Sequence, residues 1–350
     1  MLIPGQTTQV PVLGRARIST WISFNNLHYA SATMRPKNSY FSGLTGLDDI
    51  TWLPTLAFTD RHEEFKWAAN FLPGLSNEKK EEFLVQCIQY FHAKKIQVLV
   101  GIYADSGNLH GGRVNVDNAT FLANFIRNST SDFPGHARAL VAFFDDKNLD
   151  IDGISYDLES GANGAPALTA ADAPRMKEYY EAVAAELRKE ERFLAYATGA
   201  AMSGSGGYAC PEQPFSITDS ANIIARPMSY DIGKGGRETM VKYAMQNCVA
   251  PDRGLHAGEF QVALATSFAH ELHTHAEIKA ELEAVHRQYR VGYCHWSFDA
   301  VTRASDFSLH NNALNPDGPS VGTLGHPLQY PLGQRRIDAF TVSGASSSSS

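Results

Sequence analysis

The segment 149–159, LDIDGISYDLE, places acidic residues in a stretch that otherwise has the apolar composition of a buried strand. Side chains two residues apart lie on the same face of a strand, so Ser155, Asp157 and Glu159 are expected to face the same way. Because an unpaired buried carboxylate is costly, such a row persists only where a cavity or binding partners accommodate it. The alternative is an exposed edge strand, which the apolar neighbours and Gly153 disfavour, since glycine lets a second backbone approach. The segment therefore predicts a strand that ends at a polar cavity.

Strand and helix patterns alternate along the rest of the chain. Eight segments have the β-branched and apolar composition of strands: 16–24, 50–58, 96–103, 149–159, 193–198, 221–230, 260–267 and 291–298. Helical patterns occur between most of them, at 77–95, within 118–148, and at 170–191, 237–248 and 273–289. A Gly-rich loop is expected at 104–117. This alternation predicts an α/β fold, a (β/α)8 TIM barrel with its functional residues at the carboxyl ends of the strands. An open doubly wound sheet is the alternative.

One barrel accounts for most of the 350 residues. Barrels of this class run to about 250 residues or more with insertions. We expect an N-terminal extension at 1–14, the barrel at 15–340 and a flexible Ser-rich tail at 341–350.

Composition and charge exclude several classes of partner. The net charge is −7 and Lys and Arg do not cluster, which argues against nucleic acid and anionic membranes as partners. No apolar run approaches the roughly 20 residues that span a bilayer. No GxGxxG follows a strand and no GxxxxGK[ST] loop occurs, so nucleotide binding has no support. No signal peptide is visible, as expected of a cytosolic chain or of the mature form of a secreted one; a secreted origin is favoured if the chain is a mature form.

The cysteines are scattered without the spacing of a metal site: Cys87, Cys210, Cys248 and Cys294. A chain of this size needs no disulfide framework, so we expect buried free thiols and no metal.

Residues 152–159, DGISYDLE, resemble the DGxDxDxE signature of glycoside hydrolase family 18, which contains chitinases and related endo-β-N-acetylglucosaminidases. The opening Asp-Gly, the apolar third position, the second inner Asp and the terminal Glu all match. Ser155 stands where the signature has its first inner Asp.

Two later segments resemble the same family, in the family's order. Residues 228–231, MSYD, are similar to its MxYD motif and come at the end of the sixth predicted strand. Trp296, at the end of the eighth, resembles the tryptophan that forms the floor of the sugar site. The family's third-strand SxGG pattern is not matched by GIYAD at 101–105.

The resemblance implies a catalytic role for three residues. Glu159 would be the general acid, protonating the leaving oxygen. The substrate's own 2-acetamido group would attack the anomeric carbon, since family 18 uses substrate assistance in place of a second catalytic carboxylate. Asp157 would hold the acetamido N–H, and Tyr230 would donate its hydroxyl to the acetamido oxygen. No metal or organic cofactor is implied.

Further residues are expected to bind substrate or to shape the motif. The substrate-binding candidates are Ser155, Asp231, Trp296, Met228 and Tyr103, and the structural candidates are Asp152 and Gly153. Other aromatic side chains that could line a sugar cleft are Trp21, Trp52 and Tyr156, although each is individually more typical of a core.

The resemblance predicts an endo-hydrolase of β-1,4-linked N-acetylglucosamine, acting with retention of configuration on chitin-type oligosaccharides as a monomer. The sequence between the seventh and last strands holds only a loop and one helix, so we expect no additional α+β domain of the kind found in many chitinases. One alternative is an endo-β-N-acetylglucosaminidase that cuts the chitobiose core of N-glycans. The other is a non-catalytic, lectin-like protein that binds chitin or glycans.

Overall fold

The computed structural model describes residues 18–23, 29–30, 35–36, 47–53, 56–59, 61–68, 71–104, 113–158, 168, 170–199, 222–228, 261–265 and 292–296. The predicted helices at 237–248 and 273–289 lie outside these residues.

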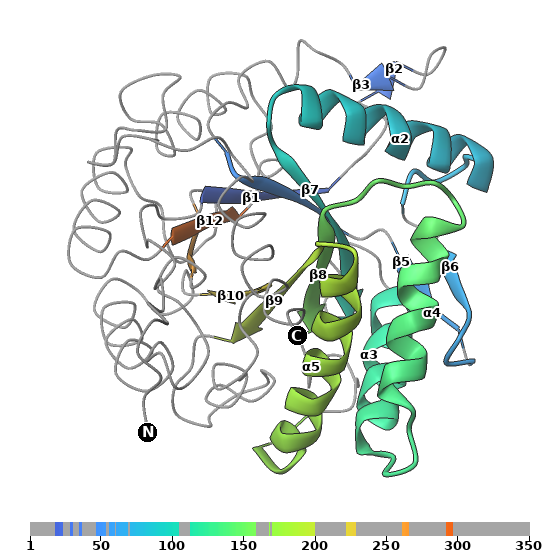
Figure 1. Ribbon diagram of the computed structural model, residues 1–350, viewed down its shortest axis with the longest axis vertical. Coiled ribbons are helices and arrows are strands. Elements are labelled where there is room, and N and C mark those ends of the chain that lie inside the picture. The colour runs from blue at the N-terminus through green and yellow to red at the C-terminus, as the bar shows by residue number, and fades with distance from the viewer. Residues whose placement is uncertain are drawn as a thin grey trace, which may run out of the picture.

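Eight parallel strands form one curved sheet (Figure 1). They are β1 (Ile18–Ser23), β4 (Asp49–Leu53), β7 (Gln97–Ala104), β8 (Gly153–Leu158), β9 (Phe193–Gly199), β10 (Ile223–Met228), β11 (Gln261–Ala265) and β12 (Gly292–Trp296). Their order is β10-β9-β8-β7-β4-β1-β12-β11, and the two end strands, β10 and β11, also contact each other. The α/β class is confirmed, and each of the eight predicted segments contributes one strand to the sheet, although β4, β7 and β9 each extend one residue beyond the predicted segment.

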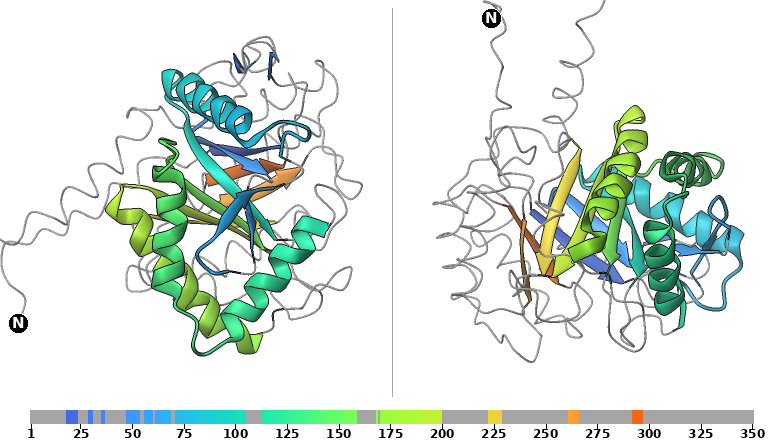
Figure 2. Two further views of the ribbon diagram at one scale, coloured as in Figure 1. Left: turned by 90° about the vertical axis from the view of Figure 1, so that its right-hand side faces the viewer. Right: turned by 90° about the horizontal axis from the view of Figure 1, so that it is seen from below.

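The described helices lie on the outer face of the sheet. They are α2 (Asn77–Ala93), α3 (Arg113–Arg127), α4 (Phe133–Asp145) and α5 (Ala173–Lys189), the last preceded by the 3-10 turn η1 (Ala170–Asp172). Helices α2 and α3 contact β7, and α5 contacts β9. The views in Figure 2 show α3, α4 and α5 packed together on one flank, with α2 on the neighbouring flank.

Local sequence explains where two of these helices begin. Ser76 caps α2, because its hydroxyl oxygen accepts a hydrogen bond from the N–H of Lys79. Asp132 caps α4 through the N–H of Gly135, and Pro134 lies in the first turn, where its missing N–H costs nothing. Helix α3 begins at Arg113, inside the segment that we expected to be entirely loop, so that boundary was wrong.

The predicted strand 50–58 is two strands in the structure, and this expectation was also wrong. Strand β4 joins the sheet, whereas β5 (Leu56–Phe58) pairs antiparallel with β6 (Phe65–Trp67). Pro54 lies between them in sequence and has no N–H for a sheet ladder. The buried Asn118 of α3 stabilises the separated strand, since its side chain accepts from the N–H of Phe58 and donates to the carbonyl of Leu56. A second short hairpin pairs β2 (Tyr29–Ala30) with β3 (Arg35–Pro36).

Among the described residues, buried apolar side chains form a larger and a smaller cluster. The larger cluster fills the space between the outer face of the sheet and the helices. The smaller is a cluster on the inner face, toward the amino ends of the strands, made of Leu99, Phe193, Ala195 and Ile224. Cys87 is a buried free thiol and Cys294 is also buried, and the other two cysteines lie outside the described residues. Within the described part of the chain, no helix is long and apolar enough to cross a membrane.

Candidate active site

The inner face of the sheet becomes polar toward the carboxyl ends of the strands, and β8 contributes Ser155 and Asp157 there. Both are buried, with 0% and 3% of their surfaces exposed. They alternate with Ile154 and Tyr156, which belong to the outer core, so strand periodicity directs Ser155 and Asp157 inward. Backbone pairing places Asp157 between Tyr103 of β7 and Ala197 of β9. The Ser155 hydroxyl has no hydrogen-bond partner among the described residues.

Gly153 brings strand β9 close to the start of β8. A Cβ atom at this position would lie 2.3 Å from the carbonyl oxygen of Phe193. Real Cβ atoms do not approach backbone oxygen so closely, so glycine is needed for this close strand pairing.

Asp152 immediately precedes β8 and fixes the start of this strand through its side chain and its backbone. Its Oδ2 accepts hydrogen bonds from the N–H of Val98 and from Nε2 of His92, each at 2.7 Å. The backbone of Asp152 bonds both neighbouring strands: its N–H donates to the carbonyl of Val98 on β7, and its carbonyl accepts from the N–H of Phe193 on β9. The hydrogen bond to Asp152 raises the pKa of His92, although burial opposes the shift.

A chain of buried hydrogen bonds holds β8 from its outer face. The Tyr156 hydroxyl lies 2.6 Å from that of Tyr179 on α5, which lies 3.1 Å from Nε2 of His136 on α4. Nδ1 of His136 lies 2.7 Å from the carbonyl oxygen of His62, which can only accept. The neutral imidazole therefore donates from Nδ1 and accepts at Nε2, so the hydroxyl of Tyr179 donates to His136 and that of Tyr156 to Tyr179.

Burial controls the charge state of this chain. It lowers the pKa of His136 to about 4 and raises the pKa of both Tyr156 and Tyr179. At neutral pH all three side chains are uncharged. Tyr156 belongs to the core and does not line a cleft, which is the more typical of the two roles that the sequence allowed.

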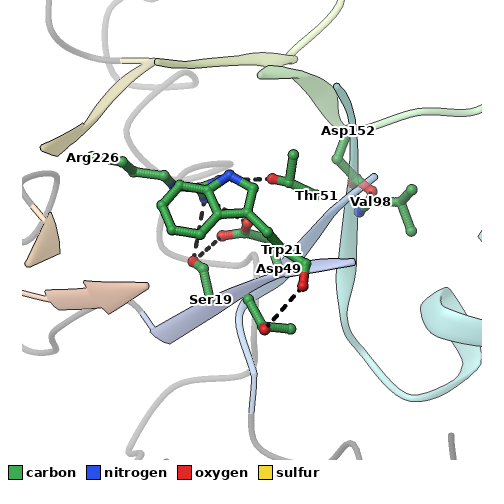
Figure 3. A network of polar contacts seen from close by, with 8 residues as sticks. Ser19, Trp21, Asp49, Thr51, Val98, Asp152 and Arg226 are labelled. Atoms are coloured by element: carbon green, nitrogen blue, oxygen red, sulfur yellow. Dashed lines mark hydrogen bonds and ion pairs between the residues drawn. The ribbon is translucent and has the colours of Figure 1, made fainter. Parts of the chain in front are cut away.

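A buried ion pair lies on the inner face of the sheet (Figure 3). Arg226 of β10 donates to Oδ1 of Asp49 at 2.5 Å and to Oγ1 of Thr51 at 2.7 Å. Nη2 of Arg226 also lies 3.3 Å from Oγ of Ser19, which donates to Oδ2 of Asp49 at 2.6 Å. Trp21 lies over the guanidinium, with its ring centroid 5.9 Å from Cζ. Every charge in this network thus has a partner of opposite sign.

Sequence reasoning missed this ion pair, although one signal was available. Arg226 is the one charged residue of the predicted strand 221–230 and has apolar neighbours on both sides, and a buried Arg requires an anionic partner. Asp49 is 177 positions away, and nothing in the sequence identifies it as that partner.

The structure places some of the remaining predicted residues by backbone alone. Met228 and Trp296 are the last residues of β10 and β12, and Tyr103 is the partner of Asp157 in register. The other three predicted site residues lie outside the described residues: Glu159, Tyr230 and Asp231. In the sequence, Glu159 directly follows the last residue of β8.

The described site offers a buried carboxylate and a buried hydroxyl from β8 on the inner face of the sheet. A buried carboxylate is suited to accept an N–H from a ligand or to offset positive charge that develops on it. The described residues contain no group of three or more His, Cys, Asp or Glu side chains that could hold a metal ion.

The fold and this site define an α/β protein of barrel-like architecture with polar residues at the carboxyl ends of its strands. Among solved structures, this chain is similar to a glycoside hydrolase family 18 chitinase from Pseudoalteromonas aurantia (TM-score 0.52, 13% identity, 83% of this chain and 97% of that one). It is also similar to catalytic domain 2 of the Group II chitinase of Ostrinia furnacalis (TM-score 0.57, 12% identity, 87% and 97%). A third similar structure is the spore cortex-lytic enzyme SleL of Bacillus megaterium (TM-score 0.56, 10% identity, 85% and 74%).

No family model and no curated protein sequence matches the chain. At these identities the structural similarity shows a shared fold. The resemblance to family 18 that the sequence motifs indicated is thereby confirmed at the level of the fold.

Proposed function

We propose that this chain is a glycoside hydrolase that cleaves β-1,4-linked N-acetylglucosamine in chitin-type oligosaccharides. The observation that carries the proposal is Asp157, a buried carboxylate facing inward at the carboxyl end of β8, in a fold shared with chitinases. The motif to which Asp157 belongs is the one that resembles family 18, so sequence and fold support the same site.

We assign the fold to a closed (β/α)8 barrel without an additional α+β domain. Contact between β10 and β11 supports closure, since these are the two end strands of the sheet. Only residues 266–291 separate β11 from β12, which is room for one helix and its loops. A barrel without the additional domain favours a shallow groove and therefore cleavage within the oligosaccharide.

In the proposed reaction Glu159 donates a proton to the glycosidic oxygen as the bond to the anomeric carbon breaks. The carbonyl oxygen of the substrate's 2-acetamido group forms the new bond, giving a cyclic oxazolinium ion. Asp157 accepts the acetamido N–H and offsets the positive charge, and Tyr230 donates its hydroxyl to the acetamido oxygen. Water, deprotonated by Glu159, then opens the ring, so the configuration is retained.

The remaining candidates would bind the sugar. Trp296 would supply an apolar surface beneath the pyranose ring, and Asp231 would accept hydrogen bonds from its hydroxyls. Met228 and Tyr103 would border the same sugar, from the ends of β10 and β7.

The test compares the parent protein with Glu159→Gln and Asp157→Asn on chitin oligosaccharides and on an N-glycosylated protein, with products identified by mass. Loss of the general acid is expected to lower kcat by about 100-fold to 10,000-fold. The matched control is Asp150→Asn, since Asp150 is an acidic residue beside β8 whose side chain is 90% exposed; its kcat should equal that of the parent.

Each outcome decides between the candidate functions. Cleavage of chitin oligosaccharides that depends on Glu159 supports the proposal. Cleavage of the glycoprotein alone would replace it with an endo-β-N-acetylglucosaminidase. Binding of the oligosaccharide without cleavage of either substrate would show a lectin-like protein.

A further inference from the structure

Arg226 is the least expected residue on the inner face of the sheet. It is fully buried, as is its partner Asp49. Its guanidinium donates hydrogen bonds to three side chains on β1 and β4: Ser19, Asp49 and Thr51 (Figure 3). The guanidinium is planar and rigid, so contacts with three side chains define both its position and its orientation.

The side chain of Arg226 spans the interior of the barrel that we propose. In the sheet order, three strands separate β10 from β4 on one side, namely β9, β8 and β7. Because β10 also contacts β11, three strands separate them on the other side, namely β11, β12 and β1. Strands β10 and β4 are therefore opposite each other, and Arg226 links the two walls.

The level of this link within the barrel follows from the strand register. Backbone pairing runs from Thr51 across β7 to Gly153, and on through β9 to Asn222. Arg226, which bonds Thr51, lies four residues beyond this row, a shift of one residue per strand, as strand tilt produces in a barrel. Strand β8 is halfway along the row, so a shift of two residues places Ser155 at the level of Arg226.

The link therefore lies directly beneath the candidate site. Side-chain layers in such barrels come from alternate strands, and β4, β8 and β10 are alternate strands here. Thr51, Ser155 and Arg226 share one layer. Asp157 and Met228 are each two residues nearer the carboxyl end, in the next layer up.

We infer that Arg226, paired with Asp49, is a positioning residue that forms the floor of the active site and sets the spacing between β10 and the opposite wall. The inference rests on the proposed function. Apolar residues of similar volume would stabilise a core at least as well as a buried ion pair, so the distinctive contribution of the pair is geometric. Met228, Tyr230 and Asp231 all follow Arg226 within five positions, so a shift of β10 would displace the groups that contact the sugar.

The test separates geometry from stability with a double variant. Arg226→Met alone leaves Asp49 buried without its cation and should lower the urea midpoint of unfolding strongly. Asp49→Asn combined with Arg226→Met removes both charges, and the oxygen of the introduced amide can still accept from Ser19, so most of the midpoint should return. The kcat of this stable double variant should nevertheless fall by about 100-fold, as expected for a misplacement of about 1 Å, with a much smaller change in KM. Arg226→Lys, which keeps the charge but not the planar fork, should retain an intermediate kcat.

The matched control is the ion pair of Arg192 with Asp145, which joins the residue before β9 to the end of α4 at 2.7 Å. Asp145→Asn combined with Arg192→Met removes the same two charges at the opposite end of the strands and should keep the parental kcat.

Hydrogen–deuterium exchange of peptides that cover β8 and β10 gives a readout independent of activity. Exchange should be faster in the Asp49/Arg226 double variant than in the parent and unchanged in the control. Parental kcat and parental exchange in the double variant would overturn the inference. If the parent cleaves no substrate, the proposed function fails, and exchange alone decides whether Arg226 positions these strands.

Discussion

Ser155 is the residue at which the chain departs from the family 18 signature, and its surroundings give that departure a physical context. Its hydroxyl faces inward, two residues before Asp157 on the same face of β8. It shares a layer with Arg226, whose charge is already matched by Asp49. A carboxylate at position 155 would therefore not share this cation, which already pairs with Asp49.

Ser155→Asp tests how charge at this position affects Asp157. Like charges close together disfavour double ionisation, so one of the two carboxyls would hold its proton to higher pH than Asp157 does in the parent. We expect the variant to remain active, with the acidic limb of its kcat/KM profile moved to higher pH. The measurement is kcat/KM for chitin oligosaccharides against pH.

Ser155→Asn is the matched control, because it adds the same volume without a charge. Its profile should keep the parental shape even if its rate is lower. Identical profiles for Ser155→Asp and the parent would show that charge at this position has no influence on the reaction.

Strand β8 is fixed both at its start and on its outer face. Asp152 attaches its start to α2 and β7 through His92 and Val98. On the outer face, the hydrogen bonds from Tyr156 to Tyr179 and His136 attach its middle to α5 and α4. Asp157 therefore lies on a rigid strand, as a group that must meet a substrate with defined geometry requires.

The hydrogen bonds that link Tyr156, Tyr179 and His136 make the stability of the protein depend on pH. Since the pKa of His136 is about 4 in the folded protein and about 6.5 in the unfolded chain, only the unfolded chain gains a proton between these values. The stabilisation is complete above about pH 6.5 and is lost as the pH falls toward 4, by up to roughly 3 kcal/mol. His136→Gln keeps one donor and one acceptor but does not titrate, so its free energy of unfolding should fall less over this range.

Urea unfolding of parent and variant at about pH 7 and about pH 4.5 measures the difference. The effect of His92 on stability has the opposite dependence on pH. Because its pKa is raised in the folded protein, it contributes stability that is lost as the pH rises through the raised value. His92 is present in both proteins, so its effect cancels in the comparison. An equal loss of stability in both proteins would show that His136 is not the titrating group.

In the closed barrel that we propose, β10 and β11 are neighbours and the eight strands leave no unpaired sheet edge. Exposed edges are the usual route by which sheets join between molecules. We therefore expect a monomer, with a mass of 38.3 kDa by light scattering. A mass twice as large that is independent of protein concentration would contradict this expectation.

The alternation of strands and helices was predictable because it is written in local patterns of apolar residues, which strands and helices repeat with different periods. For the same reason, the spacing of Ser155 and Asp157 is enough to predict that they share a face of the strand. The structure shows that this is the face opposite the outer core. The division of segment 50–58 did not, because β5 is held by Asn118, some 60 residues later in the chain.

From the sequence alone we could predict the order of the described strands, a site at their carboxyl ends and a resemblance to a family of sugar hydrolases. The tertiary structure was needed to show that Arg226 bonds Asp49, and that Tyr156 bonds Tyr179 of α5, which in turn bonds His136 of α4. The physical reason is that local patterns record which face of an element is buried, whereas the partner that meets a buried polar group depends on how distant segments pack.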